Sequence, residues 1–232
     1  MLGKESRYVE GFALGMWQAN CYIVGDVELG RAVVVDPGQG GEPQVRERLE
    51  ARGVRCEAIL LTHGHLDHLW SAPELAEQLD VPVLLHPDDR WLWDDPAAGF
   101  GNLPPGALRD QFGLDWRPPR DRLESLRDGQ TLSCAGVRTR VRHTPGHTPG
   151  SCVFLLEPDG VSADAVMLSG DLVFAGSVGR TDFPRGSWDQ LLESIRRVVL
   201  PLPDPTAVLS GHGPQTTVGR ERADNPFLRD IA

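Results

Sequence analysis

The chain has 232 residues, of which 40% are hydrophobic and 24% charged, and its formal net charge is −10. This length and composition are typical of one globular domain with a substantial core. An acidic surface repels the phosphates of nucleic acids and anionic lipid head groups, so we expect neither nucleic acid nor membrane as a partner.

Short runs rich in β-branched residues predict strands, and apolar residues at helical spacing predict helices between some of them. Two sheets packed face to face, with helices outside them, would suit this mixed order. In chain order, the pattern predicts strands at Cys21–Val24 and Arg31–Val35, a helix at Glu42–Arg52, a strand at Ala58–Leu61, a helix at Ala72–Leu79, strands at Val81–Leu85, Val137–Val141, Cys152–Leu156 and Ala165–Leu168, a helix at Trp188–Val199 and a strand at Ala207–Leu209.

One stretch, from Pro87 to Arg122, breaks this periodicity. It contains Trp91, Trp93 and Trp116, and aromatic area of that size is normally buried, which argues against disorder. We therefore predict a single domain over residues 1–232, with a tryptophan- and proline-rich insertion at about 87–122, whose role the sequence leaves open. The sequence leaves open whether its tryptophans line a cleft or cover the core.

Two features bear on the compartment. Residues 1–5 carry charges where a signal peptide needs an apolar run, and no apolar run approaches the ~18 residues that span a bilayer. The four cysteines stand alone in the sequence, as expected for small core residues in a reducing compartment: Cys21, Cys56, Cys134 and Cys152. The sequence thus predicts a cytoplasmic protein.

The segment Thr62-His63-Gly64-His65-Leu66-Asp67-His68 follows a predicted strand and precedes a predicted helix. A lone histidine is usually structural, but three with a carboxylate in six positions favour metal binding. His63 and His65 can share one ion, while Asp67 and His68 can reach a neighbouring one.

Three further candidates each lie in a glycine-containing loop beside a predicted strand: His147, Asp171 and His212. Glycine allows close approach of the backbone, and loops at strand ends often carry functional side chains. Two histidines stay outside this scheme. We interpret His143 as a supporting or surface residue, and His86 as a structural one.

The ordered set HxHxDH, His147, Asp171 and His212 resembles the metallo-β-lactamase superfamily, over about Asn20 to His212. Asp36, in Val35-Asp36-Pro37-Gly38, matches an aspartate that braces the HxHxDH loop in that family. The resemblance implies an α/β fold, a four-layered αββα sandwich with the metals in a cleft at one edge of the sheets.

The resemblance also implies how two metal ions are shared. One ion would take His63, His65 and His147; the other would take Asp67, His68 and His212; Asp171 would bridge them. Nitrogen and oxygen ligands suit zinc, and also iron or manganese. Two ions roughly 3.5–4 Å apart can hold a bridging hydroxide that hydrolyses an ester, thioester, amide or phosphodiester. Asp67 would steer the hydroxide or relay a proton, so Asp67 and Asp171 are the catalytic candidates.

Within the superfamily, the stretch Gly170–Phe183 and the ending around Gly211–Gly219 and Asn225-Pro226-Phe227 resemble the glyoxalase II-like branch, hydroxyacylglutathione hydrolases that cleave thioesters. β-Lactamases generally lack an aspartate at the position of Asp171. Only residues 213–232 follow His212, so we expect a small single-domain relative. Its substrate would be a small-molecule thioester that need not contain glutathione. Such a protein could form a homo-oligomer.

One alternative comes from persulfide dioxygenases, which share the fold and use a single iron. Their ligands would correspond to His63, His147 and Asp171. A different ester or lactone hydrolase and a non-catalytic metal-binding protein are further alternatives. Arg180, in Gly179-Arg180-Thr181-Asp182, is expected to pair with Asp182 and support the metal site from behind.

Overall fold

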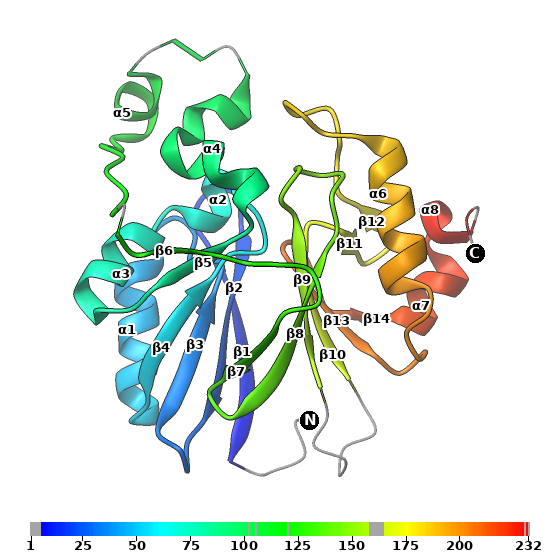
Figure 1. Ribbon diagram of the computed structural model, residues 1–232, viewed down its shortest axis with the longest axis horizontal. Coiled ribbons are helices and arrows are strands. Elements are labelled where there is room, and N and C mark those ends of the chain that lie inside the picture. Colours follow the sequence, from blue (N-terminus) through cyan, green and yellow to red (C-terminus); the bar gives the residue numbers. More distant parts are fainter. Residues whose placement is uncertain are drawn as a thin grey trace.

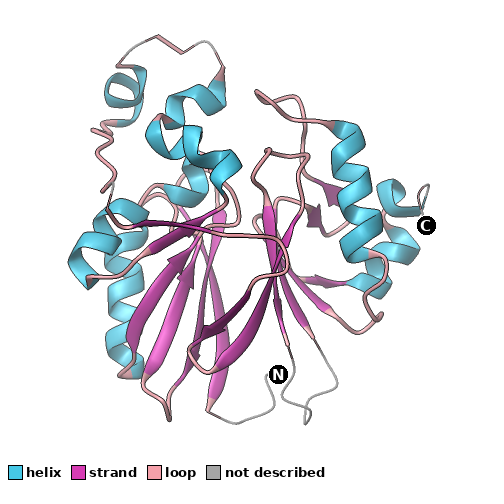
Figure 2. Ribbon diagram, in the orientation of Figure 1, coloured by secondary structure: helices cyan, strands magenta, loops and turns pink. Residues whose placement is uncertain are grey.

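The computed structural model describes residues 6–101, 103–104, 106–119, 121–157, 165–229 and 231. Two six-stranded sheets lie against each other, with helices on both outer faces (Figures 1 and 2). A small third sheet pairs β11 (Val173–Phe174) with β12 (Ser177–Val178). These are the four layers of an αββα sandwich, as predicted. No helix in the described part of the chain is long and apolar enough to cross a membrane.

The first sheet is antiparallel at one side and parallel at the other. Its first three strands pair antiparallel, and its last four pair parallel. Parallel neighbours need a crossover, and helices α1 (Gly41–Arg52) and α3 (Ala72–Leu79) supply two of them. The strand order is β1 (Arg7–Leu14), β2 (Ala19–Asp26), β3 (Arg31–Val35), β4 (Arg55–Leu60), β5 (Val83–Leu85) and β6 (Leu123–Ser125).

The second sheet is antiparallel except for one parallel pair, β10 with β13. Its order is β14 (Thr216–Thr217), β13 (Ala207–Ser210), β10 (Val166–Gly170), β9 (Cys152–Leu156), β8 (Val137–His143) and β7 (Thr131–Cys134). Its outer face carries α6 (Trp188–Ser194), which continues as a π-helical turn, η3 (Ile195–Val199), and also α7 (Val218–Asp224) and α8 (Pro226–Arg229).

Three buried clusters fill the three spaces between the four layers. The middle one joins Val33 and Leu60 of the first sheet to Phe154 and Leu168 of the second. The outer two lie between each sheet and its helices, as where α1 buries Val45. Burial on both faces explains why the central strands read as continuous apolar runs.

The stretch that breaks the sequence pattern forms short helices beyond one end of the first sheet (Figure 1, top left). Trp93 is fully buried there, and the indole nitrogen of Trp116 donates to its backbone carbonyl. The helices are η1 (Pro87–Asp89), α4 (Arg90–Asp94), η2 (Pro96–Phe100) and α5 (Ala107–Phe112).

The cysteines follow their predicted environment where the structure describes them. Cys21, Cys56 and Cys152 are buried and unbridged. The side chain of Cys134 and residues 1–5 lie outside the described part of the chain.

Candidate metal centre

The HxHxDH segment changes from an extended chain to a helix in its middle. His65 is extended, with φ −69° and ψ 147°, and the short helix α2 (Leu66–Leu69) begins directly after it. Asp67 therefore lies in the first turn of a helix, where the helix dipole favours a carboxylate. The break separates the motif into His63 and His65 before the helix and Asp67 and His68 within it.

His147 comes from the facing sheet, in the loop between β8 and β9. At Gly146, φ is +143°, and a Cβ atom would lie 2.4 Å from the backbone of Leu191 in α6. Only glycine fits so close a contact, so this loop can pack on α6 while it presents the next residue, His147, to the opposite sheet.

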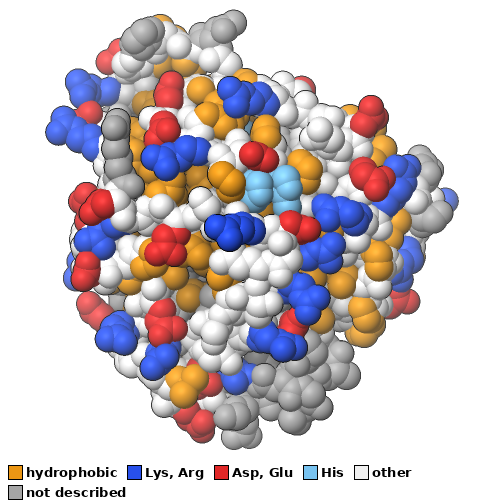
Figure 3. Space-filling view, viewed as in Figure 1, with side chains coloured by type: hydrophobic (Ala, Val, Ile, Leu, Met, Phe, Trp, Pro, Cys, Tyr) orange, Lys and Arg blue, Asp and Glu red, His pale blue; other side chains and the backbone are white. Residues whose placement is uncertain are grey.

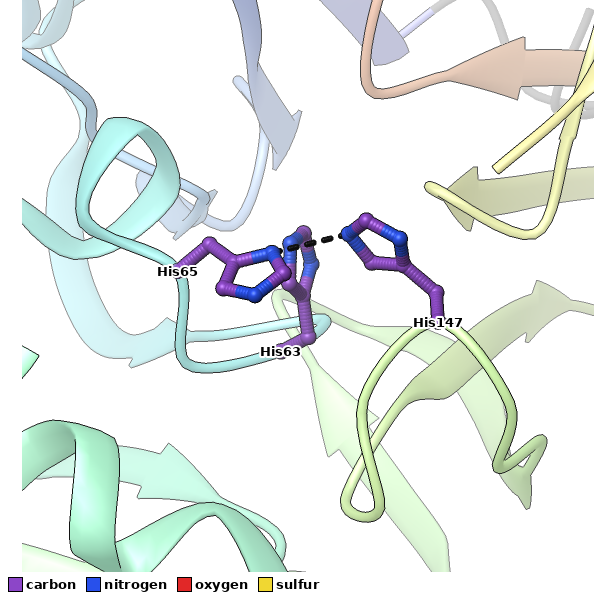
Figure 4. A group of neighbouring side chains, drawn as sticks. All are labelled: His63, His65 and His147. Carbon is purple, nitrogen blue, oxygen red and sulfur yellow. Dashed lines mark hydrogen bonds between the residues drawn. The ribbon is translucent and has the colours of Figure 1, made fainter. Parts of the chain in front are cut away.

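Three histidine side chains converge from these two loops (Figure 4). The ring centroids lie 4.9 Å apart for His63 and His65, 4.8 Å for His63 and His147, and 4.5 Å for His65 and His147. Nδ1 of His65 lies 2.8 Å from Nε2 of His147. Nε2 of His63 is buried and makes no hydrogen bond. A buried ring nitrogen without a partner is suited to a metal ion, and Nδ1 of His65 and Nε2 of His147, which face each other, can complete the same site.

Burial also gives two of these rings the right protonation state. Desolvation, reinforced by the neighbouring histidines, lowers the pKa of His63 and His65 well below the ordinary value. Both rings are therefore neutral at pH 7 and keep a lone pair, which a metal ligand requires.

A second group lies beside the first and contains Asp67, His68 and His212. Nε2 of His212 lies 3.2 Å from Oδ2 of Asp67 and 3.3 Å from Nε2 of His68. Asp171 stands between the two groups. Its Oδ1 lies 3.4 Å from Nε2 of His68, and its Oδ2 lies 3.5 Å from Nε2 of His147. All seven predicted ligand side chains thus meet at one place.

The electrostatics of the second group favour a cation. Burial alone would lower the pKa of His68, but the carboxylates of Asp67, Asp171 and Asp36 outweigh burial and raise this pKa to about 10. Burial would raise the pKa of Asp67, yet His68 and His212 hold it well below its usual range. This cluster of carboxylates attracts positive charge, whether a proton or a metal ion.

Hydrogen bonds behind the site orient two of the rings. Asp36 accepts from the amide of Thr62 at 2.8 Å and from its hydroxyl at 2.6 Å, and its Oδ2 lies 3.0 Å from Nδ1 of His68. Nδ1 of His147 lies 2.7 Å from the carbonyl of Arg180. Each contact leaves Nε2 free as the ligand atom. Arg180 acts through its backbone, while its guanidinium pairs with Asp182 as predicted.

The sequence reasoning missed Asp89, whose carboxylate joins the two loops that carry the three histidines. Its Oδ2 accepts from the amide of Gly64 at 2.8 Å and from the hydroxyl of Thr148 at 2.6 Å, and its Oδ1 accepts from the amide of Gly150 at 2.7 Å. Asp89 is 0% exposed. Burial raises its pKa despite these three donors.

The two histidines left out of the site lie together elsewhere. His86 stacks on His143 with a centroid distance of 3.9 Å and an interplanar angle of 9°. Parallel rings cannot direct their in-plane lone pairs at one ion, although Asp88 lies beside them. His143 instead contacts the carbonyl of Pro149 through Nε2, at 2.8 Å, and so supports the His147 loop.

A pocket of about 350 Å³ opens onto the ligands, a volume typical of small-molecule sites. A larger hollow of about 640 Å³, between β1 and β13, has no histidine or acid among the described residues that line it, so it does not bear on the metal chemistry.

On the face in Figure 3, basic and acidic side chains are interspersed rather than gathered into one patch of a single sign.

Comparison with known proteins identifies the family of the chain. Residues 14–212 match the sequence model of the metallo-beta-lactamase superfamily, and the chain belongs to that family. It is 36% identical to the hydroxyacylglutathione hydrolase GloC of Haemophilus influenzae, covering 95% of this chain and 97% of the relative. It is 37% identical to the probable metallo-hydrolase YqgX of Bacillus subtilis, covering 94% and 96%.

Two solved structures are similar over almost their whole length. BLEG-1, described as a B3 metallo-beta-lactamase, has a TM-score of 0.79 and 35% identity, with 95% of this chain and 99% of that chain covered. TTHA1623, solved in a di-iron-bound form, has a TM-score of 0.76 and 36% identity, with 94% and 100% covered. The fold, the ligand clusters and these relatives define a metallo-hydrolase with a dinuclear metal site.

Proposed function

We propose that this protein hydrolyses a thioester of a small thiol carrier, as a glyoxalase II-like enzyme. The observation that carries the proposal is the place of Asp171 between two complete ligand groups, within 3.6 Å of ring nitrogens in both. The similarity to GloC, named as a hydroxyacylglutathione hydrolase, supports the thioester as the bond that is cleaved.

In this proposal, His63, His65 and His147 would hold one ion, Asp67, His68 and His212 would hold the other, and Asp171 would be a ligand of both. The nitrogen and oxygen donors suit zinc, iron or manganese. When bound, the ions would supply Lewis acidity, which acidifies a water molecule and polarises the acyl carbonyl.

The chain's own residues fit the leaving group of a thioester. Outside the seven ligands, Arg180 is the one ionisable side chain among the described residues that line the pocket. No separate acid is therefore available there to protonate a leaving group. A thiol has a pKa of about 8.5 and leaves as a thiolate near neutral pH without such help, whereas an amine does not. Asp67, which lines the pocket, would steer the attacking water by accepting a hydrogen bond from it.

Two rival reactions are included in the test. BLEG-1 is described as a B3 metallo-beta-lactamase, and a persulfide dioxygenase is the alternative left open by the sequence. A persulfide dioxygenase would need iron at His63, His147 and Asp171 alone. The second ligand group is complete in this chain, and TTHA1623 holds two irons, which favours a two-ion hydrolase.

The experiment measures three activities on one metal-loaded preparation: hydrolysis of S-lactoylglutathione, hydrolysis of nitrocefin, and oxygen uptake with glutathione persulfide. We expect thioester hydrolysis that is lost with Asp171→Ala, with little of the other two activities. Oxygen uptake without thioester turnover would replace the proposal with a dioxygenase, and nitrocefin turnover alone would replace it with a β-lactamase.

A further inference from the structure

Aromatic rings surround the ligand side chains on several sides. Phe183 packs edge-on against His65, with centroids 5.1 Å apart, and Phe174 packs against His212 at 6.0 Å. Trp17 and Phe100, 6.2 Å apart, line another part of the same pocket. A substrate that reaches the metal-binding side chains must therefore pass between apolar surfaces.

Among the described residues that line the pocket, the one basic side chain, Arg180, is paired with an acid. Arg180 forms a bidentate pair with Asp182, at 2.6 Å and 2.5 Å, and its guanidinium lies 4.3 Å over the ring of Phe183. No other lysine or arginine is found among the described lining residues. Away from the two ions of the proposed function, a substrate carboxylate, such as either carboxylate of glutathione, thus meets no unpaired lysine or arginine among the described residues that line this pocket, and burying it unpaired is costly.

From these walls and this charge distribution, we infer that the substrate carries an uncharged, apolar group of aromatic-ring size beside the thioester. The inference rests on the proposed function and narrows its substrate class. A pocket of about 350 Å³ has room for such a group next to the scissile bond, and rings that meet edge-on or offset add to the gain from apolar burial. The apolar group can be on the acyl side or on the thiol side.

The experiment compares thioesters that separate the two sides. Phenylacetyl and lactoyl groups are each joined to N-acetylcysteamine and to glutathione, and benzyl mercaptan is joined to the lactoyl group. We expect kcat/KM to rise at least tenfold when a phenyl ring is added on one of the two sides, a value at the lower end for an apolar group in a pocket. We also expect glutathione to give no advantage over N-acetylcysteamine.

A matched pair of variants tests whether the pocket wall causes this preference. Phe100 lines the pocket and is 37% exposed, so Phe100→Ala should fold normally. Phe227 is 38% exposed and packs on Trp188, away from the pocket lining. We expect Phe100→Ala to remove most of the preference for the phenyl-bearing substrate, because it should lower kcat/KM for that substrate by more than for the lactoyl N-acetylcysteamine thioester. Phe227→Ala should change neither.

The possible outcomes test this inference separately from the proposed thioester hydrolysis. A preference for the lactoyl–glutathione thioester over all phenyl-bearing compounds would overturn the inference and leave the thioesterase intact. A phenyl preference that survives Phe100→Ala and Trp17→Ala would also overturn it, because the aromatic wall would not be its source. Turnover of none of the five compounds would remove the thioesterase proposal itself, and the inference with it.

Discussion

The carboxylate of Asp89 is expected to hold both loops of the three-histidine group in place, so Asp89→Ala should loosen both loops together. The change leaves the amides of Gly64 and Gly150 without their acceptor, while the hydroxyl of Thr148 can still donate to Ser151 Oγ, 2.7 Å away. A buried unsatisfied donor costs about 1–3 kcal/mol. Two such amides give an expected loss of about 3 kcal/mol in the free energy of unfolding, after an offset because the carboxyl group no longer has to be buried.

Metal affinity should fall with stability, because Gly64 lies between His63 and His65, and Thr148 follows His147. Hydrogen-bond partners of ligands typically contribute about 10–100-fold to affinity. Urea unfolding of chelator-treated protein and zinc titration with a competing indicator measure the two effects separately.

The control is Asp88→Ala, one residue away in the same 3₁₀ turn, with a side chain that is 58% exposed. It should alter neither quantity appreciably. If Asp89→Ala unfolds within about 1 kcal/mol of wild type and binds zinc equally well, the carboxylate does not hold these loops, and our reasoning on it is wrong.

Three further predictions concern the metal ligands. Asp171→Ala and His147→Ala should each lose nearly all activity and most bound metal, and elemental analysis showing full metal content in both would remove them from the site. Zinc binding to chelator-treated protein at pH 7 should release at least one proton, because His68, with a pKa of about 10, is protonated there. Its affinity should therefore rise with pH between 6 and 8, and calorimetric heats that do not depend on the buffer's ionisation enthalpy would contradict this. Gly211→Ala should lower metal occupancy, because the new Cβ would lie 2.1 Å from Oδ1 of Asp171; unchanged occupancy would show that the loop has room to move.

Much of the sandwich could be predicted because its central strands are buried on both faces. The runs predicted at Arg31–Val35 and Cys152–Leu156 coincide with β3 and β9, and the helix predicted at Glu42–Arg52 differs from α1 by one residue. The edge strand β1 (Arg7–Leu14) was missed, since Leu14 is its one fully buried residue and its pairing with β2 is decided by tertiary structure.

The helix predicted at Trp188–Val199 begins where expected, at Trp188, directly after the N-cap residue Ser187, whose hydroxyl accepts from the amide of Gln190. Its second half, Ile195–Val199, is π-helical. Apolar spacing predicted the buried face of this segment, but apolar spacing alone does not distinguish an α-helical turn from a π-helical one.

The candidate ligands could be found from the sequence because histidines and aspartates in short loops after strands are rare without a function. The contacts that support them could not. Asp89 accepts hydrogen bonds from backbone amides of residues far along the chain, such as Gly64. Because almost every residue has a backbone amide, the sequence does not reveal which one is bound. Arg180 contacts His147 through its carbonyl, which any residue at that position possesses.

The central claim is that two ions are held around Asp171. Elemental analysis of protein purified without added metal, on the fraction that turns over a thioester, tests it most directly. The account predicts about two divalent ions per chain, falling together with activity on chelation and returning together with added metal. One iron per chain in the fully active fraction would contradict it.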